Sequence, residues 1–301
     1  MAAQQLALGV DIGGSALRVA ATGDPAHVSR AAIGRATTVE QLLTALGACV
    51  AAVARGRPME AMAVAIPSFV RDDGTVGECP AIPALTGVDL RAAVSSALAV
   101  RVEVVPDLAA AAVGEYRYGS GRGVERFLCV ALGTGANAAA IVSGRVVDTA
   151  FGCLGDAGHV LVEPDGPECA CGGRGCLEAM ASGWALQQAA IAEGLPVGPA
   201  LTAAALDGDE RARELYVRAG VALGRAISSW SVMIWPDLVA VAGGVSAAGE
   251  LLLTPARAEL IRIAPPYVAS RLRLVQAELG DLATLTGACH LAGELVSGSP
   301  A

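Results

Sequence analysis

Residues 159–178 read HVLVEPDGPECACGGRGCLE, and this segment carries one histidine and three cysteines within eighteen residues. The four side chains are His159, Cys169, Cys171 and Cys176. Three thiolates and one imidazole form a complete tetrahedral ligand set for Zn²⁺ and leave no coordination position open for water. A site closed in this way is structural, so we predict a zinc ion that stiffens this loop without taking part in the chemistry.

The alternative interpretation of this segment is a chance cluster of buried or redox-active cysteines. In an intracellular chain, closely spaced Cys and His residues indicate a metal site more often than a disulfide framework. Glycines at 172, 173 and 175 also allow the chain to turn back, so that the last cysteine closes the site. The remaining cysteines are scattered through apolar segments, and we expect them to be small core residues.

Composition excludes several classes of protein. The chain has 301 residues, a net charge of −8 and a pI of about 5.0, so nothing indicates a nucleic-acid or anionic-membrane partner. All 21 Lys and Arg residues are arginines, which excludes mechanisms that need a catalytic lysine, the Walker A loop among them. Because we find neither a signal-peptide pattern nor an apolar run of membrane length, we predict a cytoplasmic protein.

Two glycine-bearing turns lie between predicted strands. Residues 11–15, DIGGS, separate strands at 6–10 and 17–22, and residues 133–135, GTG, follow a strand at 127–132. The backbone N–H groups of such turns can approach a phosphate, so the pair could hold a nucleotide from two sides. The DxGG pattern also occurs in ordinary hairpins, and it is weak evidence by itself.

Strands alternate with helices along the rest of the chain, which indicates an α/β fold with partly parallel sheets. A capping box that starts at Thr37 predicts a helix as far as about Ala54. A buried strand at 238–242 ends in a glycine pair, a usual resting place for the base and ribose of a nucleotide. Further helices are predicted at 108–118, 176–193, 209–234 and 281–296.

Taken together, these motifs resemble the ROK family (repressors, open reading frames and kinases), and especially its glucokinase-like sugar kinases. They occur in the order and spacing of the family and cover almost the whole chain. The matching motifs are DIGGS at 11–15, PD at 106–107, LGTGAN at 132–137, GDAGH at 155–159, CACGGRGCLE at 169–178 and AGGV at 242–245.

The resemblance implies an actin-like, ribonuclease-H-like ATPase fold of two α/β lobes with the active site in the cleft. The N-terminal lobe would comprise residues 1–118 and be joined by the C-terminal helix at about 281–301. The C-terminal lobe would comprise residues 119–280 and include the zinc-binding loop, with 119–123 as the hinge. ATP and Mg²⁺ would be the cofactors, beside structural Zn²⁺, although some relatives use polyphosphate as the phosphoryl donor.

The same resemblance assigns roles to individual residues. Asp107 matches the general base that accepts the proton of a primary hydroxyl as this oxygen attacks the γ-phosphate. Phosphates, Mg²⁺ and adenosine would be bound by Asp11, Gly13, Gly14, Ser15, Gly133, Thr134, Gly135, Gly243 and Gly244. Substrate hydroxyls would be bound by Ser68, Asp156, His159 and Glu178, with His159 also on zinc. Structural roles compete with two of these assignments, since Asp107 could cap a helix and Glu178 could be a first-turn acid.

Several positions depart from the family pattern on the sugar side of the site. Where the family has Asn-Asp-x-Asn, this chain has Pro-Asp-Leu-Ala at 106–109, so both amides are lost. Asp156 replaces the usual Glu and Ala81 an Asn, whereas Ala16 in place of Lys is a milder change near the phosphates. Because lost donors imply a different hydroxyl pattern, we expect a modified sugar or a C7 cyclitol as the substrate, with plain glucose as the alternative.

Two other classes of function compete with a kinase. ROK repressors need a DNA-binding segment ahead of the first strand, for which this sequence leaves no room, and the net charge is acidic. A catalytically silent sugar-binding protein is disfavoured because Asp107 and the glycine turns are intact. The expected partners are therefore a small-molecule substrate and, by resemblance, a second copy of the chain in a homodimer, without nucleic acid or membrane.

Overall fold

The computed structural model describes residues 6–149 and 153–298, which group into two compact units. Unit 1 comprises 1–122, 144–155 and 281–301, and unit 2 comprises 123–143 and 156–280. These units differ from the predicted lobes at 119–122 and 144–155, which group with unit 1. The outer ends of the predicted N-terminal lobe, residues 1–5 and 299–301, lie outside the described residues.

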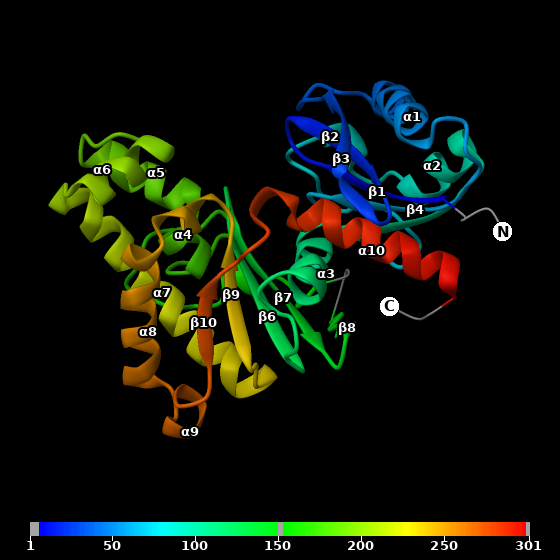
Figure 1. Cartoon of the computed structure of the whole chain (residues 1–301). Helices are drawn as coiled ribbons and strands as arrows, with labels where there is room; N and C mark the ends of the chain where they lie inside the picture. The colour runs from blue at the N-terminus through cyan, green and yellow to red at the C-terminus, as the bar shows by residue number, and fades with distance from the viewer. Residues whose placement is uncertain (1–5, 150–152, 299–301) are drawn as a thin grey trace. The chain divides into compact units, whose positions relative to one another are not determined.

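Unit 1 is built on a five-stranded sheet of order β3-β2-β1-β4-β5 (Figure 1). The central strand β1 is buried along its whole length, as its continuous apolar sequence predicts for a strand covered on both faces. It pairs antiparallel with β2 and parallel with β4, and β5 is parallel to β4. The strands are β1 (Leu6–Ile12), β2 (Ala16–Ala21), β3 (Asp24–Ala32), β4 (Met59–Ile66) and β5 (Arg101–Pro106).

Two pairs of helices cover the faces of this sheet. On one face are α1 (Val39–Ala54) and α2 (Leu90–Leu98), and on the other α3 (Asp107–Tyr118) and α10 (Ala283–Ser297) (Figure 1). The capping box of α1 begins one residue later than predicted. Thr38 caps the helix and pairs with Gln41, whereas the Thr37 hydroxyl accepts a hydrogen bond from Gly34 N.

Helix α10 packs closely against α3 and β1, because glycines at their contacts remove the side chains that would hold them apart. A Cβ at Gly287 would lie 1.7 Å from the Ala110 carbonyl oxygen, and one at Gly114 would lie 2.3 Å from the Ala283 oxygen. On the strand side, a Cβ at Gly9 would lie 2.4 Å from Cys289 N. The last helix is therefore an integral part of unit 1.

A second mixed sheet has the strand order β10-β9-β6-β7-β8, and its first four strands lie in unit 2. The hairpin β6–β7 is antiparallel, while β9 runs parallel to β6 and β10 parallel to β9. The α/β class with partly parallel sheets is as predicted. The strands are β6 (Arg126–Leu132), β7 (Ala136–Val142), β8 (Arg145–Val146, grouped with unit 1), β9 (Leu238–Ala242) and β10 (Arg273–Gln276).

The helices of unit 2 differ from the prediction in one place that bears on the site. The predicted helix 176–193 is two helices, α4 (Leu177–Ala181) and α5 (Gly183–Ala192). Between them, the Ser182 hydroxyl accepts a hydrogen bond from Ala185 N at 3.1 Å and so caps the second helix. The others are α6 (Pro199–Asp207), which the sequence analysis missed, α7 (Glu210–Ile234), α8 (Glu250–Ile263) and α9 (Pro266–Ala269).

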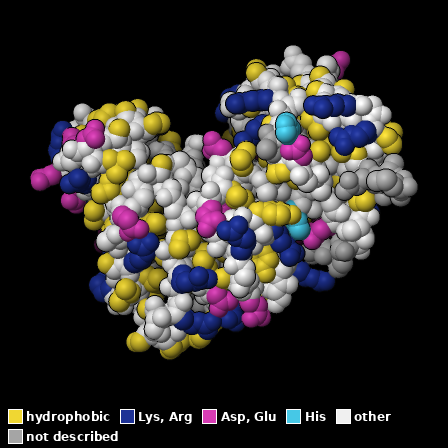
Figure 2. Space-filling view, in the orientation of Figure 1, with side chains coloured by type: hydrophobic (Ala, Val, Ile, Leu, Met, Phe, Trp, Pro, Cys, Tyr) yellow, Lys and Arg dark blue, Asp and Glu magenta, His cyan; other side chains and the backbone are white. Residues whose placement is uncertain are grey.

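The 3₁₀ helices of the described residues are η1 (Pro83–Leu85), η2 (Ala157–His159), η3 (Gly244–Ala248) and η4 (Gly280–Leu282). Among the described residues, no helix combines the length and the apolar character needed to cross a membrane. On the face drawn in Figure 2, arginine side chains are interspersed with Asp and Glu side chains.

Candidate functional site: a metal cage and two glycine turns

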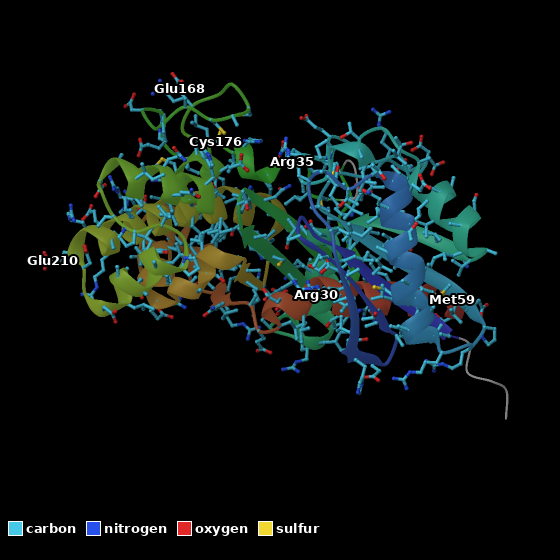
Figure 3. All side chains as sticks on the ribbon, turned by 90° about the horizontal axis from the view of Figure 1, so that it is seen from above. Arg30, Arg35, Met59, Glu168, Cys176 and Glu210 are labelled. Atoms are coloured by element: carbon cyan, nitrogen blue, oxygen red, sulfur yellow. The ribbon has the colours of Figure 1, made fainter. Side chains whose placement is uncertain are left out.

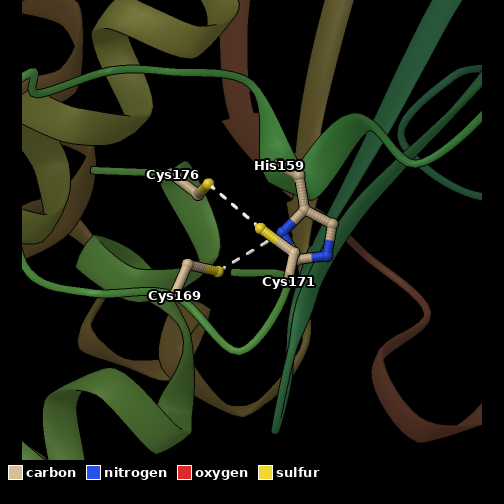
Figure 4. A group of neighbouring side chains, drawn as sticks. All are labelled: His159, Cys169, Cys171 and Cys176. Atoms are coloured by element: carbon tan, nitrogen blue, oxygen red, sulfur yellow. Dashed lines mark hydrogen bonds between the residues drawn. The ribbon is translucent and has the colours of Figure 1, made fainter. Parts of the chain in front are cut away.

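The predicted metal ligands lie together in unit 2. The ligand atoms of His159, Cys169, Cys171 and Cys176 all lie within 4.8 Å of one another. In Figure 4, His159 Nδ1 faces the Cys169 sulfur at 3.4 Å, and the sulfurs of Cys171 and Cys176 are 3.7 Å apart. Zn–S bonds of about 2.3 Å in a tetrahedron separate two sulfurs by about 3.8 Å. The donor set and its spacing therefore fit a tetrahedral zinc ion.

Glycines shape the loop that carries these ligands. Gly172 and Gly175 have φ angles of +88° and +67°, which side chains rarely tolerate, and a Cβ at Gly175 would lie 1.6 Å from the Glu163 carbonyl oxygen. Figure 3 shows Glu168 on the outside of this loop and Cys176 at its base, where α4 begins. These glycines thus allow the tight turn that brings Cys176 to the other three ligands of the metal cage, which consists of His159, Cys169, Cys171 and Cys176.

The local environment of the thiols differs across the cage. Burial raises the pKa of the Cys176 thiol to about 12, and neighbouring sulfurs add to the shift. The pKa of exposed Cys171 is lowered, chiefly by the Gly173 N–H, which lies 3.4 Å from the sulfur. Adjacent thiolates repel one another, and a bound dication would offset this repulsion.

His159 has a different neighbour at each ring nitrogen. Nδ1 faces Cys169, and Nε2 lies 3.5 Å from a carboxylate oxygen of Asp156. A carboxylate on the second nitrogen of a metal-binding histidine fixes its tautomer and orientation. The structure thereby brings Asp156, a predicted substrate residue, to the edge of the metal cage.

The second glycine turn, Gly133–Gly135, connects β6 to β7 as predicted. Glu178, in the first turn of α4, accepts a hydrogen bond from Ala136 N at 3.0 Å. A Cβ at Gly133 would meet nothing within 4 Å, so packing does not require glycine there. The open surface suits the close approach of a phosphate to the backbone.

The two glycines after β9, Gly243 and Gly244, differ in their structural surroundings. Gly243 has φ of +87°, and a Cβ there would lie 2.4 Å from the Leu132 carbonyl oxygen, so the fold itself requires glycine. Nothing lies within 4 Å of a Cβ on Gly244. Of the two predicted adenosine contacts, only Gly244 lacks a structural explanation.

In unit 1, the first glycine turn joins β1 to β2. Gly13 N donates to Ala16 O at 2.9 Å, which closes the hairpin over Gly14 and Ser15. A Cβ on Gly13 or Gly14 would make only ordinary contacts, at 3.5 and 3.6 Å. Neither packing nor a positive φ requires glycine at these positions, so free access to the backbone is the remaining reason for it.

Asp11 ends up beside a cation that the sequence analysis did not single out. Arg18 is its cross-strand partner in the β1–β2 register, and both Nε and Nη2 of Arg18 donate to Oδ2 of Asp11. Burial raises the pKa of Asp11, and the guanidinium opposes this shift. The pairing of residues across a tight hairpin is the signal that could have revealed Arg18.

Asp107 is the first residue of α3, directly after β5. Its carboxylate accepts a hydrogen bond from the adjacent Leu108 N at 2.7 Å, but Pro106 is the N-cap of α3 and no side chain caps this helix, so the competing role as a helix cap is wrong. Burial raises the pKa of Asp107 to about 6, the Leu108 N–H lowers it, and the charge of Asp11 raises it further. A carboxyl group with a pKa near neutrality is well matched to general-base work.

The remaining sugar-side positions of unit 1 are apolar or already hydrogen-bonded. Leu108 and Ala109, which follow Asp107, are only 8% and 4% exposed, and Ala109 stands where the family has Asn. The Ser68 hydroxyl lies 3.0 Å from the Glu78 carbonyl oxygen and 3.1 Å from that of Phe69. Backbone oxygens thus already engage the hydroxyl that was predicted to bind substrate.

Comparison with known proteins places these features in a family. The model of the ROK family matches residues 7–294. The chain is 28% identical to a glucokinase from Thermotoga maritima, over 97% of this chain and 98% of that protein. It is 32% identical to a kanosamine kinase from Amycolatopsis mediterranei, over 97% of each. Among solved structures, it resembles a ROK family glucokinase from Streptomyces griseus in complex with glucose and AMPPNP, with 31% identity, a TM-score of 0.78 and coverage of 96% and 99%.

Proposed function

Because the chain belongs to the ROK family of sugar kinases, we propose that it transfers the γ-phosphate of ATP to a primary hydroxyl group of a modified sugar or cyclitol. It has the actin-like α/β ATPase fold of the ROK glucokinases that are its structural neighbours. The observation that carries the catalytic part of the proposal is Asp107, a partly buried carboxyl group whose pKa is raised to about 6.

In the proposed reaction, the Asp107 carboxylate accepts the proton of the attacking hydroxyl. The hydroxyl oxygen forms a bond to the γ-phosphorus as the bond to the bridging oxygen of ADP breaks. The protein forms no covalent bond to the substrate in this reaction. Most of the catalysis therefore comes from positioning the two substrates and neutralising the charge of the phosphates. Phosphate oxygens would be bound by the backbone N–H groups of Gly14, Ser15, Thr134 and Gly135, since those of Gly13 and Gly133 donate within their own turns. Mg²⁺ that accompanies ATP would lie near Asp11.

A structural zinc ion is the second part of the proposal. His159 and the three cysteines would hold it, and their spacing and chemistry support this assignment. Zinc would fix the loop that carries Asp156 and His159 and leave no open coordination position for chemistry. We assign substrate hydroxyls to Asp156 and Glu178. Weaker candidates are Ser68, already bonded to backbone oxygens, and His159, whose two ring nitrogens face Cys169 and Asp156.

The substrate is proposed to differ from plain glucose. The loss of the family's amides at 106 and 109 and the burial of Leu108 and Ala109 favour a ligand with a different pattern of hydroxyls. The similarity to a kanosamine kinase points in the same direction. A modified sugar, such as an amino sugar, and a C7 cyclitol are both compatible with this pattern, and ordinary glucose is the second candidate because of the glucokinase relatives.

The decisive experiment measures ADP release with Mg²⁺-ATP across hexoses, amino sugars and C7 cyclitols, for the natural protein and Asp107→Asn. We expect a modified sugar or cyclitol to give the highest kcat/KM. Loss of the general base should lower kcat by about 10²–10⁴-fold. Asp89→Asn is a matched control, because Asp89 caps α2 through Ala92 N and Asn also caps helices well.

The alternatives give different results in the same assay. A glucose kcat/KM equal to or above that of every other acceptor would show an ordinary glucokinase. Absence of turnover on the whole panel would contradict the kinase assignment and favour a silent sugar-binding protein. Polyphosphate offered in place of ATP tests the identity of the phosphoryl donor.

A further inference from the structure

The turn Gly133–Ala136 is held from two sides by segments that each adjoin a ligand of the metal cage. One segment, the histidine arm, is 157–159 and ends in His159. The other, the cysteine arm, is 176–184 and starts at Cys176. All of these residues lie in unit 2.

The histidine arm touches the end of the turn. A Cβ at Gly158 would lie 1.8 Å from the Ala136 carbonyl oxygen, so the two backbones are in direct contact. One residue earlier, Ala157 N donates to the Asn137 side-chain oxygen at 3.0 Å. Position 158 therefore admits no side chain while the arm stays against β7.

The cysteine arm contacts the turn at three points. The Glu178 carboxylate accepts a hydrogen bond from Ala136 N at 3.0 Å. Where α4 gives way to α5, Gly183 N donates to Gly133 O at 2.7 Å and Trp184 N donates to Thr134 O at 3.2 Å. The helix break that the sequence did not predict thus presents two N–H groups to the turn.

Two glycines are explained by these contacts alone. A Cβ at Gly135 would lie 2.6 Å from the Glu178 carboxylate oxygen, and one at Gly183 would lie 2.8 Å from Gly133 O. Gly133, by contrast, faces open space. The arms therefore support the turn from behind and leave one side of it accessible.

We propose that Glu178 is a positioning residue for this turn, and that the two arms couple metal binding in the cage to nucleotide binding. The inference rests on the proposed function, in which the turn binds ATP phosphates. A metal bonded to His159 and Cys176 cross-links the arms and thereby reduces the conformational freedom that the turn must lose when it binds phosphate. Such coupling is reciprocal, so nucleotide must also strengthen metal retention.

The first test measures ADP affinity by calorimetry with Mg²⁺ and without sugar, on zinc-loaded protein. We expect Glu178→Ala to weaken ADP binding about tenfold, the effect of losing one charge-assisted hydrogen bond. Glu178→Gln keeps an oxygen for Ala136 N and should stay within about threefold of the natural protein. Glu168→Ala is the matched control, since Glu168 lies on the outside of the same loop and pairs only with Arg174 among the described residues.

A second variant reaches the turn without touching the carboxylate. Gly183→Ala places a methyl group against Gly133 O and should also weaken ADP binding. Metal content is measured for every variant, so that loss of zinc is distinguished from loss of the contact. This variant keeps the inference testable if Glu178→Ala does not fold.

The reciprocal test follows zinc transfer to a metallochromic chelator, with and without ADP. We expect ADP to lower the fraction of zinc released at equilibrium, and Glu178→Ala to reduce this protection. If the natural protein binds ADP, but the Glu178→Ala and Gly183→Ala affinities and zinc release with and without ADP are unchanged, the coupling is wrong and the kinase assignment stands. If the natural protein does not bind ADP at all, the proposed function fails and the coupling fails with it.

Discussion

At the scale of single residues, two carboxylates and one guanidinium set the electrostatics of the proposed catalytic centre. Asp11 is 5% exposed and forms an ion pair with Arg18. Both burial and the negative charge of Asp11 raise the pKa of Asp107. Arg18 therefore moderates the repulsion between the two acids. The chain lacks the lysine usual for the family at position 16 but has an arginine two residues later on the same strand, where it faces Asp11.

This arrangement predicts the acid limb of the pH–rate profile. A general base works only when deprotonated, and the pKa of Asp107 is raised to about 6. We expect kcat/KM to be flat above this pH and to fall about tenfold per pH unit below it. Steady-state rates on the best substrate from about pH 5 to 8 would show the limb.

Two variants check that assignment. Asp89→Asn should retain both the plateau and the limb, because Asp89 serves the end of α2. Arg18→Met removes the cation that lowers the pKa of Asp11, and this variant should therefore shift or distort the acid limb of the pH–rate profile. A profile that stays flat through pH 6 in the natural protein would contradict a base with the environment of Asp107.

At the scale of elements, the contact between α3 and α10 depends on two glycines. Gly287 and Gly114 allow backbone to approach backbone, and the Cβ distances of 1.7 and 2.3 Å show that alanine does not fit. Close helix approach of this kind brings many weak dispersion contacts together. Neither glycine could be recognised as a contact residue from the sequence, since a glycine within a helix indicates only low helix propensity until its neighbour is known.

Gly287→Ala should therefore lower the free energy of unfolding by about 3 kcal/mol, through overpacking of the α3–α10 contact. Gly47 in α1 is the matched control, because a Cβ at this position would meet nothing within 4 Å. Gly47→Ala should raise the free energy of unfolding by about 0.5–1 kcal/mol. Urea unfolding followed by circular dichroism measures both, and equal effects of the two substitutions would contradict close packing at α10.

At the scale of the whole molecule, the sequence predicted the chemistry-bearing motifs better than the contacts between them. The metal ligands, the hairpin turns and the α/β class follow from local pattern. The Asp11–Arg18 pair and the hydrogen bond from Ala136 N to Glu178 do not, because they depend on strand register and on a helix break at Ser182. Local shifts, such as the cap at Thr38 in place of Thr37, arise because Gln at position 41 serves a capping box as well as Glu.

The resemblance to the ROK family also predicts a homodimer, and unit 2 exposes apolar side chains that a partner could cover. Met233, Ile261 and Tyr267 are 72%, 67% and 59% exposed. Light scattering coupled to size exclusion should give twice the chain mass of 30.0 kDa. A mass of one chain, unchanged as the protein concentration is raised, would contradict the dimer.

The place of α10 in unit 1 has a consequence for synthesis on the ribosome. Strand β1 and helix α3 emerge before unit 2, but their packing partner, residues 283–297, is translated only after unit 2. The apolar surfaces that α10 covers thus stay unprotected while the whole of unit 2 is being made. We expect nascent chains stalled before residue 283 to recruit chaperones at the first unit, and release of the full chain to end this recruitment.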